Sequence, residues 1–530
     1  MNTAGAVAQA LAEAGVTKAF GLPGGEVLVL IDELRKVGID FVLMRHEANA
    51  GIAASVYGKL NRQPGVVIAT LGPGAANLLL PIASAYLDQE PLLAITAQIP
   101  DEFPALHTHQ LLPLHETFQP ICRVVDKITQ GNVSEVVDRA MAACMTRPFT
   151  ASYLTLSARE ALQPITMIGR KYNEGPPTRP MANPAAKAAD LRARCAMAKR
   201  PLVLLGLGVD VLNAARLRRW IEKWQLPVAV TPKVKGLIDE TSPNFVGVIS
   251  GMAADGVMVE ALNAADLRIG FGLDPVEIDK TWHAELEIQW VLESRNATGA
   301  LPNESPLVNH MALLDAMLDA PPPKNWGTPF AAFQKTRADM LNGSPGAAGV
   351  MWPGDIIRAL SAAVPTETIV TTDVGSHKYL FGQYWPSRHP ETFWMSNGLS
   401  GMAYGLSAAI GAKLARPDTP VLAAVGDGGF SMNAQELETA ERVGAPFITV
   451  VLEDASYSLI KLSQENKKLE PYRMDFRQID NVKIADACGV KGLRTSNPDE
   501  MASAVKTAIA RNESLVVAVP VHYSDYRKLF

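Results

Sequence analysis

Short apolar segments alternate with alanine-rich segments along most of this chain of 530 residues. Apolar runs rich in Val, Ile and Leu lie, for example, within residues 64–74, 200–208 and 446–454, and each has the length of a buried β-strand. The alanine-rich stretches between such runs are typical of helices. This alternation predicts an α/β fold of doubly wound parallel sheets, with helices on both faces of each sheet.

Two polar, proline-rich segments, residues 169–184 and 320–329, interrupt the pattern. They divide the chain into three blocks, and each block is long enough to form a domain with its own core. We therefore expect domains over residues 1–165, 185–322 and 350–530.

The first and third blocks contain the same order of features. Residues 66–96 and 421–450 both run from a strand through a glycine loop, a helix and a proline to a second strand, and residues 50–60 resemble residues 404–414. This similarity predicts that the outer blocks are diverged copies of one fold, although any two doubly wound domains share part of it. Ligands of such folds bind where strands end, so each copy should offer half of a binding site.

The composition narrows the possible partners. The formal charge of −5 arises from 49 basic and 54 acidic residues mixed along the chain, so neither a nucleic acid nor a membrane is expected as partner. Small molecules remain the expected ligands. Residues 1–20 are typical of an amphipathic helix and lack the basic region and cleavage site of a leader. Because the cysteines are far apart and suggest no disulfide framework, we expect a cytoplasmic location.

Carboxylates follow two neighbouring apolar segments in the third block. Asp427 stands among glycines at the end of the first segment, and Glu453 and Asp454 end the next one. Strand-end carboxylates that face one pocket suit Mg²⁺, which prefers oxygen ligands and often shares them with phosphates. The sequence therefore predicts a Mg²⁺ site with Asp427 and Asp454 as ligands. The alternative is a tight turn in which Asp427 only caps the next helix.

The glycine–aspartate–glycine segment, together with the later pair Glu453–Asp454, resembles the cofactor motif of thiamine diphosphate-dependent enzymes. The resemblance extends over nearly the whole chain. It implies a pyrimidine-binding domain over residues 1–165, a central domain over 185–322 and a diphosphate-binding domain over 350–530. Family members bind the cofactor between the first domain of one subunit and the third domain of another. A homodimer or homotetramer with active sites between subunits is therefore implied.

The resemblance also implies which residues hold the metal ion and the cofactor. Asp454 matches a metal-ligating position and the carbonyl of Ser456 matches the third protein ligand, whereas Glu453 departs from the Asn of many relatives. The implied cofactor-binding residues are mostly glycines and small polar residues in loops. They are Pro23, Gly24, Gly74, Asn77, Gly375, Ser376, His377, Ser400, Met402, Gly426, Gly428, Gly429, Tyr457 and Ser458.

Glu47 precedes an alanine- and glycine-rich helix in the first block and matches the catalytic glutamate of the family. In the family this acid shares a proton with the pyrimidine ring of the cofactor. A buried carboxyl group suits that role because desolvation stabilises the protonated form of an acid. The alternative is a surface acid that pairs with Arg45 or His46.

Two segments resemble acetolactate synthases more than other branches of the family, namely residues 372–385 and 396–405. Met402, in the second segment, matches a methionine that supports the bent cofactor in those synthases. The alternative for this residue is a core-filling role, which is common for methionine.

Residues 108–121 and 270–283 resemble the flavin-independent, catabolic type of acetolactate synthase. Phe118 and Gln119 fall on the active-site pair of that type and are therefore implied to be catalytic. Residues 288–299 lack the acidic strand end that a nucleotide ribose would use. FAD is consequently not expected as a cofactor.

The resemblance implies a thiamine diphosphate- and Mg²⁺-dependent carboligase that decarboxylates pyruvate and joins the remaining two-carbon unit to a second 2-oxo acid, giving acetolactate. The alternatives are a 2-hydroxyacyl lyase or acyltransferase, or a 2-oxo acid decarboxylase, of the same superfamily. A catalytically inactive regulatory paralogue is a further hypothesis, against which the retained Glu47, Asp427 and Asp454 argue. The acceptor is left open, because residues 457–472 differ from the segment that lines the substrate channel in biosynthetic relatives.

Overall fold

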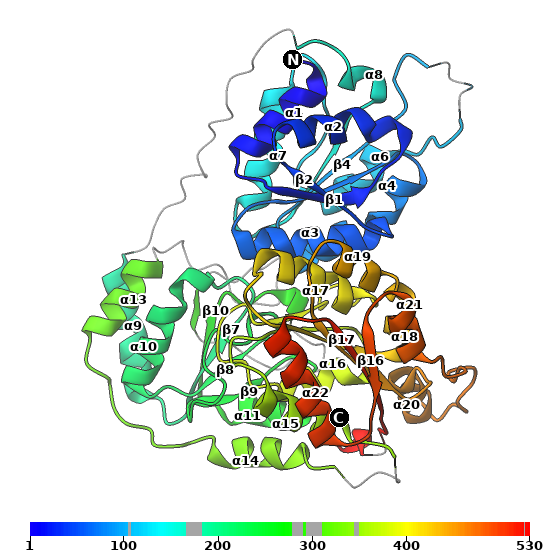
Figure 1. Cartoon of the computed structure of the whole chain (residues 1–530). Coiled ribbons are helices and arrows are strands. Elements are labelled where there is room, and N and C mark those ends of the chain that lie inside the picture. The colour runs from blue at the N-terminus through cyan, green and yellow to red at the C-terminus, as the bar shows by residue number, and fades with distance from the viewer. Residues whose placement is uncertain are drawn as a thin grey trace.

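The structure of the protein is a computed structural model that contains three α/β units (Figure 1). The first unit, in blue and cyan, lies above the central unit in green and the third unit in yellow to red. The described residues are 1–103, 106, 108–165, 183–277, 290–292, 310–343, 349–523 and 525–529.

The first sheet has six parallel strands in the order β2-β1-β3-β4-β6-β5. The strands are β1 Lys18–Leu22, β2 Asp40–Leu43, β3 Gly65–Ala69, β4 Leu92–Thr96, β5 Val125–Lys127 and β6 Ala151–Thr155. The helices are α1 Thr3–Glu13, α2 Leu28–Lys36, α3 Glu47–Asn61, α4 Pro73–Asn77, α5 Leu79–Leu87, α6 Leu114–Phe118, α7 Val133–Met145 and α8 Ala158–Ala161, with short 3₁₀ turns η1 Gly25–Val27 and η2 Gln119–Ile121.

The central sheet has five parallel strands in the order β11-β10-β7-β8-β9. They are β7 Pro201–Leu205, β8 Val228–Val230, β9 Phe245–Val248, β10 Leu267–Phe271 and β11 Trp290–Leu292. The helices are α9 Pro184–Met197, α10 Ala214–Trp224, α11 Asp255–Ala264, α13 His310–Asp319 and α14 Ala331–Met340, with the turns η3 Val211–Asn213, η4 Pro232–Val234 and η5 Pro275–Glu277. The predicted absence of an acidic strand end within 288–299 lies outside the described residues, apart from the backbone of β11.

The third sheet has six parallel strands in the order β13-β12-β14-β15-β17-β16. They are β12 Ile369–Thr372, β13 Phe393–Met395, β14 Val421–Gly426, β15 Ile448–Glu453, β16 Lys491–Arg494 and β17 Leu515–Pro520. The helices are α15 Pro353–Ala363, α16 Ser376–Tyr384, α17 Tyr404–Ala415, α18 Asp427–Asn433, α19 Glu436–Arg442, α20 Ser458–Asn466, α21 Asn481–Ala487 and α22 Pro498–Arg511, followed by the turn η6 Tyr526–Leu529.

The outer sheets have the same topology. When the strands of each sheet are renumbered from its own first strand, both orders become 2-1-3-4-6-5, whereas the central sheet becomes 5-4-1-2-3. The two outer units therefore share more than the general features of doubly wound sheets. The predicted α/β fold with three parallel sheets, and the prediction that the outer blocks are diverged copies, are confirmed. The three sheets lie within the predicted domain ranges, but the boundaries themselves stay predictions.

The two repeated helices α3 and α17 pack against each other between the first and third units. Gly411 makes this packing close, because a Cβ atom at that position would lie 2.2 Å from the carbonyl oxygen of Ala53. Both helices are apolar on nearly every side, since each is covered by its own sheet and by the other helix. The contact fixes the two outer units relative to one another.

Local sequence signals explain where several helices begin. The side chain of Asn497 accepts hydrogen bonds from the backbone N–H groups of Asp499 and Glu500, and Pro498 is the first residue of α22. Asn183 and Pro184 begin α9 in the same way. Within the described part of the chain, no helix combines the length and the apolar character needed to cross a bilayer.

Candidate active site

The acidic residues predicted to bind the metal ion lie at one edge of the third sheet. Strands β12, β14 and β15 are neighbours, with Thr372 beside Ala424 and Gly426 beside Leu452. Their carboxyl ends therefore meet at the same edge, as expected for parallel strands. Asp427 directly follows β14 and Asp454 directly follows β15.

Asp427 is the first residue of α18 and is buried. One carboxylate oxygen, Oδ1, accepts a hydrogen bond of 2.9 Å from the backbone N–H of Gly428 in its own helix. The other oxygen, Oδ2, accepts a bond of 2.8 Å from the N–H of Ala455, in the loop after β15. The capping alternative therefore accounts for only one of the two oxygens, and the second links the helix to the neighbouring strand end.

Asp454 lies close to Asp427. Its Oδ2 accepts a hydrogen bond from the hydroxyl of Ser458, and its Oδ1 accepts one of 3.4 Å from the N–H of Ser456. Burial, and to a smaller extent the charge of Asp427, raise the pKa of Asp454 to about 6. Burial also raises the pKa of Asp427. Two buried carboxylates that repel each other are stabilised by a cation between them.

The donor set fits Mg²⁺ better than a transition metal. Among the residues that the structure describes, no three His, Cys, Asp or Glu side chains are gathered so as to hold a metal ion. The predicted ligands are two carboxylates and the backbone carbonyl of Ser456, which leaves the other octahedral positions to phosphate oxygens and water. The assignment of Asp427, Asp454 and Ser456 to a metal ion stays a prediction.

Glu453 has a different role from its neighbour Asp454. It is buried, and its Oε2 lies 2.6 Å from Nη1 of Arg494 on β16. Its Oε1 accepts a hydrogen bond of 2.8 Å from the amide of Asn481. Many relatives have Asn at the position of Glu453. In this chain the negative charge of Glu453 is compensated by Arg494, and its contacts with Arg494 and Asn481 lie within the third unit.

The glycines next to Asp427 allow other side chains to approach the strand ends. A Cβ atom at Gly429 would lie 2.1 Å from Oδ2 of Asp373, and one at Gly428 would lie 2.8 Å from the ring of Tyr457. Tyr457 is 39% exposed, so its ring lies at the mouth of this site. The glycines are needed because larger residues would displace the side chains that surround Asp427.

The N-terminus of α16 offers two buried polar atoms without a partner. Neither the hydroxyl of Ser376 nor Nε2 of His377 makes a hydrogen bond. Burial lowers the pKa of His377 to about 3, so the ring is neutral. The ring also lies beside the glycine loop, because a Cβ atom at Gly426 would be 3.1 Å from its Cε1. Unsatisfied donors at a helix N-terminus suit an anionic group, and they fit the predicted diphosphate.

The predicted residues Ser400 and Met402 lie in the loop that precedes α17. The Ser400 hydroxyl donates a hydrogen bond of 2.8 Å to the carbonyl of Asn397 and accepts one of 3.3 Å from Nζ of Lys378. Met402 is half-buried and does not belong to the buried core. The structure therefore does not place Met402 in the core, and its contact with the cofactor stays a prediction.

A second cluster of predicted residues forms in the first unit. Glu47 is the first residue of α3, is 6% exposed, and accepts a hydrogen bond of 2.9 Å at Oε2 from the amide of Asn77. A Cβ atom at Gly74 would lie 3.4 Å from Oε1 of Glu47, and one at Gly24 would lie 2.6 Å from Thr70. Glu47, Gly24, Gly74 and Asn77 thus gather where β1, β2 and β3 end, next to Pro23.

The alternative that Glu47 is a surface acid paired with its neighbours is wrong. Arg45 forms an ion pair of 2.7 Å with Glu438, and Nδ1 of His46 accepts a hydrogen bond from Ala48. The partner of Glu47 is the amide of Asn77 within the cluster. A buried carboxyl group with one neutral partner can bind a proton and share it with a ligand.

The predicted catalytic pair Phe118 and Gln119 lies in the first unit, where α6 ends and η2 begins. The ring of Phe118 is fully buried and stacks on Tyr153 at a centroid distance of 4.1 Å. Gln119 is exposed at the start of η2. None of the hydrogen bonds and ring contacts between described residues joins this pair to Glu47, so its catalytic role stays a prediction.

The single chain contains two half-sites. No hydrogen bond or ion pair between described residues links the Glu47 and Asn77 cluster to Asp427 or Asp454. The first half-site offers a buried acid, and the second offers the predicted metal ligands together with a helix end suited to an anion. Each half corresponds to one copy of the repeated fold.

Several residues at the second half-site were not predicted from the sequence. Asp373 follows β12, and burial raises its pKa to about 6, while its carboxylate accepts a hydrogen bond of 3.0 Å from the N–H of Ala403. The strand–acid–glycine order in residues 371–375 matches that around Asp427 and could have revealed it. Tyr526 donates a hydrogen bond of 2.9 Å to the carbonyl of Ser376 and supports the start of α16.

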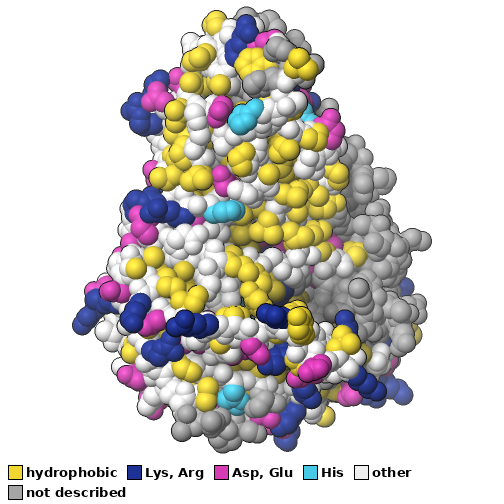
Figure 2. All heavy atoms as spheres, turned by 90° about the vertical axis from the view of Figure 1, so that its right-hand side faces the viewer, with side chains coloured by type: hydrophobic (Ala, Val, Ile, Leu, Met, Phe, Trp, Pro, Cys, Tyr) yellow, Lys and Arg dark blue, Asp and Glu magenta, His cyan; other side chains and the backbone are white. Residues whose placement is uncertain are grey.

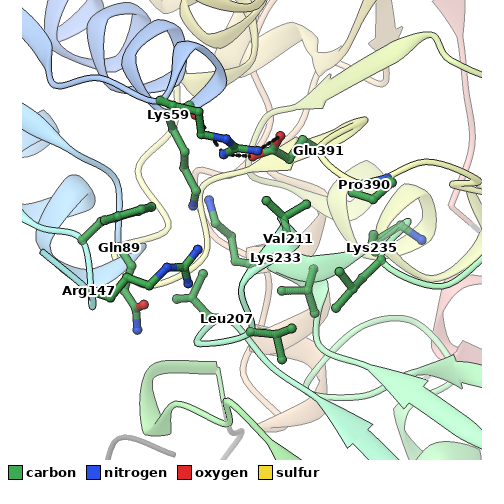
Figure 3. Close-up of a pocket in the computed structure, with 14 residues that line it drawn as sticks. Lys59, Gln89, Arg147, Leu207, Val211, Lys233, Lys235, Pro390 and Glu391 are labelled. Carbon is green, nitrogen blue, oxygen red and sulfur yellow. Dashed lines mark hydrogen bonds and ion pairs between the residues drawn. The ribbon is translucent and has the colours of Figure 1, made fainter. Parts of the chain in front are cut away.

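A separate small pocket lies where the three units meet (Figure 3). Its described lining includes none of the predicted cofactor-binding residues. Most of its cations have an acidic partner; for example, Arg62 contacts Glu391 at 2.7 Å. Figure 3 shows Lys59 from α3 and Lys233 from η4 pointing toward one another.

Replacing Lys59 with Met is expected to stabilise the protein at pH 7. Burial and the nearby charge of Lys233 lower the pKa of Lys59 to about 8, although Glu90, Glu391 and Asp88 act in the opposite direction. Because the folded state disfavours the ammonium form, the stability contributed by this group is complete above the unfolded pKa and is lost as the pH falls through about 8. The midpoint of thermal unfolding should therefore rise by on the order of 2 °C at pH 7 and less at pH 9.5.

The control for this measurement is Lys491→Met, which removes a surface lysine paired with Glu513. Surface ion pairs contribute little, so this variant should unfold at nearly the wild-type temperature. A lower midpoint for Lys59→Met at pH 7 would contradict the prediction.

Known proteins resemble the chain along its whole length. Residues 1–121, 188–291 and 373–519 match the N-terminal TPP binding domain, the central domain and the C-terminal TPP binding domain of thiamine pyrophosphate enzymes. The acetolactate synthase of Bacillus subtilis (strain 168) is 30% identical over 98% of this chain and 93% of its own length. The acetolactate synthase isozyme 2 large subunit of Escherichia coli (strain K12) is 28% identical over 96% of the chain and 93% of its own length. The catabolic acetolactate synthase of Raoultella terrigena is 27% identical over the same shares, 96% and 93%.

The chain belongs to the family of enzymes that depend on thiamine pyrophosphate, which is the same compound as thiamine diphosphate. Within that family it is acetolactate synthase-like, as the sequence motifs indicated. The prediction of an enzyme of this family is confirmed.

Proposed function

We propose that the protein is a Mg²⁺-dependent acetolactate synthase of the catabolic type. The observation that carries this proposal is that the chain contains two complementary half-sites, one with a buried acid at Glu47 and one with Asp427 and Asp454 near the unpartnered Ser376 and His377. When bound, thiamine diphosphate supplies an electron sink for the decarboxylation of a 2-oxo acid and for carbon–carbon bond formation with a second one.

The chain's own residues bind and orient the cofactor. Asp427, Asp454 and the carbonyl of Ser456 would hold Mg²⁺, whose charge offsets that of the diphosphate. Ser376 and neutral His377 can donate hydrogen bonds to the diphosphate, which would satisfy their buried polar atoms.

Glu47 is the proposed acid at the other end of the cofactor. Its carboxyl group would hold a proton toward the pyrimidine ring, while the hydrogen bond from Asn77 fixes the orientation of the carboxyl plane. Because the carboxyl group of Glu47 is buried, water has little access to its proton, and the proton stays within the site. Glu47 is therefore a catalytic residue in this proposal, and Asn77 is a positioning residue.

The active site is proposed to form between two subunits of a homodimer or homotetramer. Figure 2 shows hydrophobic side chains gathered across the middle of the face on the right-hand side of Figure 1. Exposed apolar side chains accompany both half-sites, since Leu43 shortly precedes Glu47 in the sequence, Leu79 shortly follows Asn77, and Met432 lies on α18. An apolar face of this kind favours association with a second copy, which would bring a first half-site to a second one.

The proposed enzyme works without FAD. In doubly wound folds a nucleotide phosphate binds backbone N–H groups of the glycine loop after the first strand. In the central unit that loop follows β7, and the N–H of Leu207 donates a hydrogen bond of 2.7 Å to the carboxylate of Glu277. Because the N–H of Leu207 already donates to Glu277, it is not free to bind the phosphate of a flavin nucleotide. We also propose a cytoplasmic location, because all four cysteines are free thiols.

Purified protein is expected to be colourless and to convert pyruvate to acetolactate with thiamine diphosphate and Mg²⁺ alone. The net reaction is not a redox reaction, so a flavin is not needed chemically. The product can be measured as acetoin after acid treatment, and a second assay with added 2-oxobutyrate identifies the acceptor. Stoichiometric flavin absorbance, with activity lost on its removal, would overturn the cofactor proposal. Acetaldehyde as the sole product would favour a 2-oxo acid decarboxylase.

A further inference from the structure

A buried acid in the first unit holds part of the second half-site. Asp88 follows α5 and is fully buried. Its Oδ1 accepts a hydrogen bond of 2.7 Å from the N–H of Gly398, and its Oδ2 accepts one of 3.1 Å from the N–H of Asn397. These two residues belong to residues 396–402, which carry Ser400 and are called the cofactor loop below.

A lysine of the central unit joins the same group. Nζ of Lys233 lies 3.4 Å from Oδ2 of Asp88 and 3.0 Å from Oε1 of Glu90, and it donates a hydrogen bond of 2.9 Å to the carbonyl of Met395. Met395 ends β13, directly before the cofactor loop. Lys233 therefore contacts the first unit and the start of the loop at once.

Glu90 extends the contacts to both repeated helices. Its Oε2 accepts a hydrogen bond of 2.7 Å from the hydroxyl of Ser55 on α3. Its Oε1 accepts one of 3.4 Å from the hydroxyl of Tyr404, the first residue of α17. The loop is thus held between β13 and α17 by groups that belong to the first and central units.

The cofactor loop also packs tightly on α5. A Cβ atom at Gly398 would lie 2.5 Å from Cβ of Leu87, so any larger residue would push the loop away from the helix. On its other side, Lys378 of α16 contacts Ser400. The loop therefore lies between the buried acid in the first unit and the helix whose N-terminus carries Ser376 and His377.

The three charged groups depend on one another. Burial disfavours the charged forms of Lys233 and Glu90, but the carboxylates of Asp88 and Glu90 raise the pKa of Lys233, and Lys233 lowers the pKa of Glu90. All three side chains are at most 3% exposed. Removing one charge would leave the others buried without compensation, which is costly in a protein interior.

We propose that Asp88, Glu90 and Lys233 form a clamp that fixes the cofactor loop in the position that binds thiamine diphosphate. The proposal rests on the proposed function for the identity of the ligand, but the clamp itself is defined by contacts within the chain. The three are positioning residues, because they act through the loop. Through Lys233, the central unit thereby contributes to cofactor binding.

The test compares Lys233→Met with Lys235→Met. Both lysines lie in the same short segment, and both are buried in an ion pair with an acid, but Lys235 contacts Glu240 and the carbonyl of Trp385 and not the cofactor loop. A merely structural role would make the two variants behave alike. Backbone hydrogen exchange of residues 396–402 is measured on the protein without cofactor, and thiamine diphosphate binding with Mg²⁺ is then measured by titration calorimetry.

Lys233→Met is expected to speed exchange at Asn397 and Gly398 and to raise the Kd for thiamine diphosphate about tenfold or more, as the loss of a charged hydrogen bond predicts. Lys235→Met should leave both quantities near the wild-type values. Lys233→Arg, which keeps the charge, should restore part of the affinity. Equal effects of the two Met variants, or unchanged binding by Lys233→Met, would overturn the clamp.

Two further outcomes separate the clamp from the proposed function. If the wild-type protein binds no thiamine diphosphate, the proposed function fails. The clamp is tested separately, because unchanged hydrogen exchange of residues 396–402 in Lys233→Met would reject it whether or not the cofactor binds. If Lys233→Met does not fold, Asp88→Asn keeps the shape of the side chain and removes its charge. Faster loop exchange in Asp88→Asn with unaltered cofactor affinity would overturn the role in cofactor binding.

Discussion

Replacing Asp427 with Ala is expected to abolish the Mg²⁺-dependent retention of thiamine diphosphate. The carboxylate links the start of α18 to the loop after β15 and lies beside Asp454, so its loss removes a metal ligand and one tie between the strand ends. Metal and diphosphate neutralise each other, so both should bind more weakly, by about two orders of magnitude or more in Kd. Titration calorimetry with thiamine diphosphate, with and without Mg²⁺, measures the effect.

The matched control is Glu453→Gln, which changes the acid at the end of the neighbouring strand. Glu453 pairs with Arg494 and not with the predicted metal site, so this variant should lose some stability but keep wild-type cofactor binding. Tight binding of thiamine diphosphate by Asp427→Ala would reject the metal assignment. A loss of binding in Glu453→Gln as large as that in Asp427→Ala would show that the effect is not specific to the proposed ligand.

The features that could be predicted from the sequence are those that local patterns determine. Apolar runs of strand length separated by helices require parallel sheets, and the shared order of features in residues 66–96 and 421–450 led to the common strand order of the outer sheets. Acids that directly follow strands, such as Asp427 and Asp454, are placed together by the parallel arrangement itself. The edge of the sheet that carries the site was therefore predictable.

Contacts between distant parts of the chain were not predictable in the same way. Asp88, Glu90 and Lys233 are ordinary charged residues in the sequence, and only the packing of three units brings them into one buried group. Motif matching also says nothing of a side chain's neighbours. Phe118 was assigned by resemblance to an active-site pair, yet its ring stacks on Tyr153 in the core of the first unit. Glu453 similarly looked like a second strand-end acid before its partner Arg494 was known.

The two half-sites differ in the groups that they offer to a ligand. Glu47 and Asp427 belong to equivalent edges of two copies of one fold, and each edge ends in small residues that would allow a ligand to approach. Among the described residues of the two edges, the second edge alone combines neighbouring carboxylates suited to a metal ion with unpartnered donors suited to an anion. In the proposed function, the two copies therefore bind different ends of one ligand.

The first edge is tested by Glu47→Gln, which is expected to leave cofactor binding within a few-fold of wild type while slowing proton exchange at C2 of the bound cofactor by two orders of magnitude or more. Glutamine keeps the shape of the side chain, and its carbonyl can still accept the hydrogen bond from Asn77. It cannot hold the acidic proton that the pyrimidine ring would share. Exchange is followed by NMR after mixing the loaded enzyme with deuterated water.

The control for this variant is Glu436→Gln. Glu436 is a buried acid on α19 that accepts hydrogen bonds from Arg45, just before α3, and from Asn49 in the first turn of α3. Both substitutions remove a buried carboxyl group next to α3, but only Glu47 lies with Gly74 and Asn77 in the first half-site. Glu436→Gln should therefore exchange at the wild-type rate even if it unfolds at a lower temperature. Wild-type exchange in Glu47→Gln would show that another group activates the cofactor, and equally slow exchange in both variants would trace the effect to the packing of α3 and not to the acid.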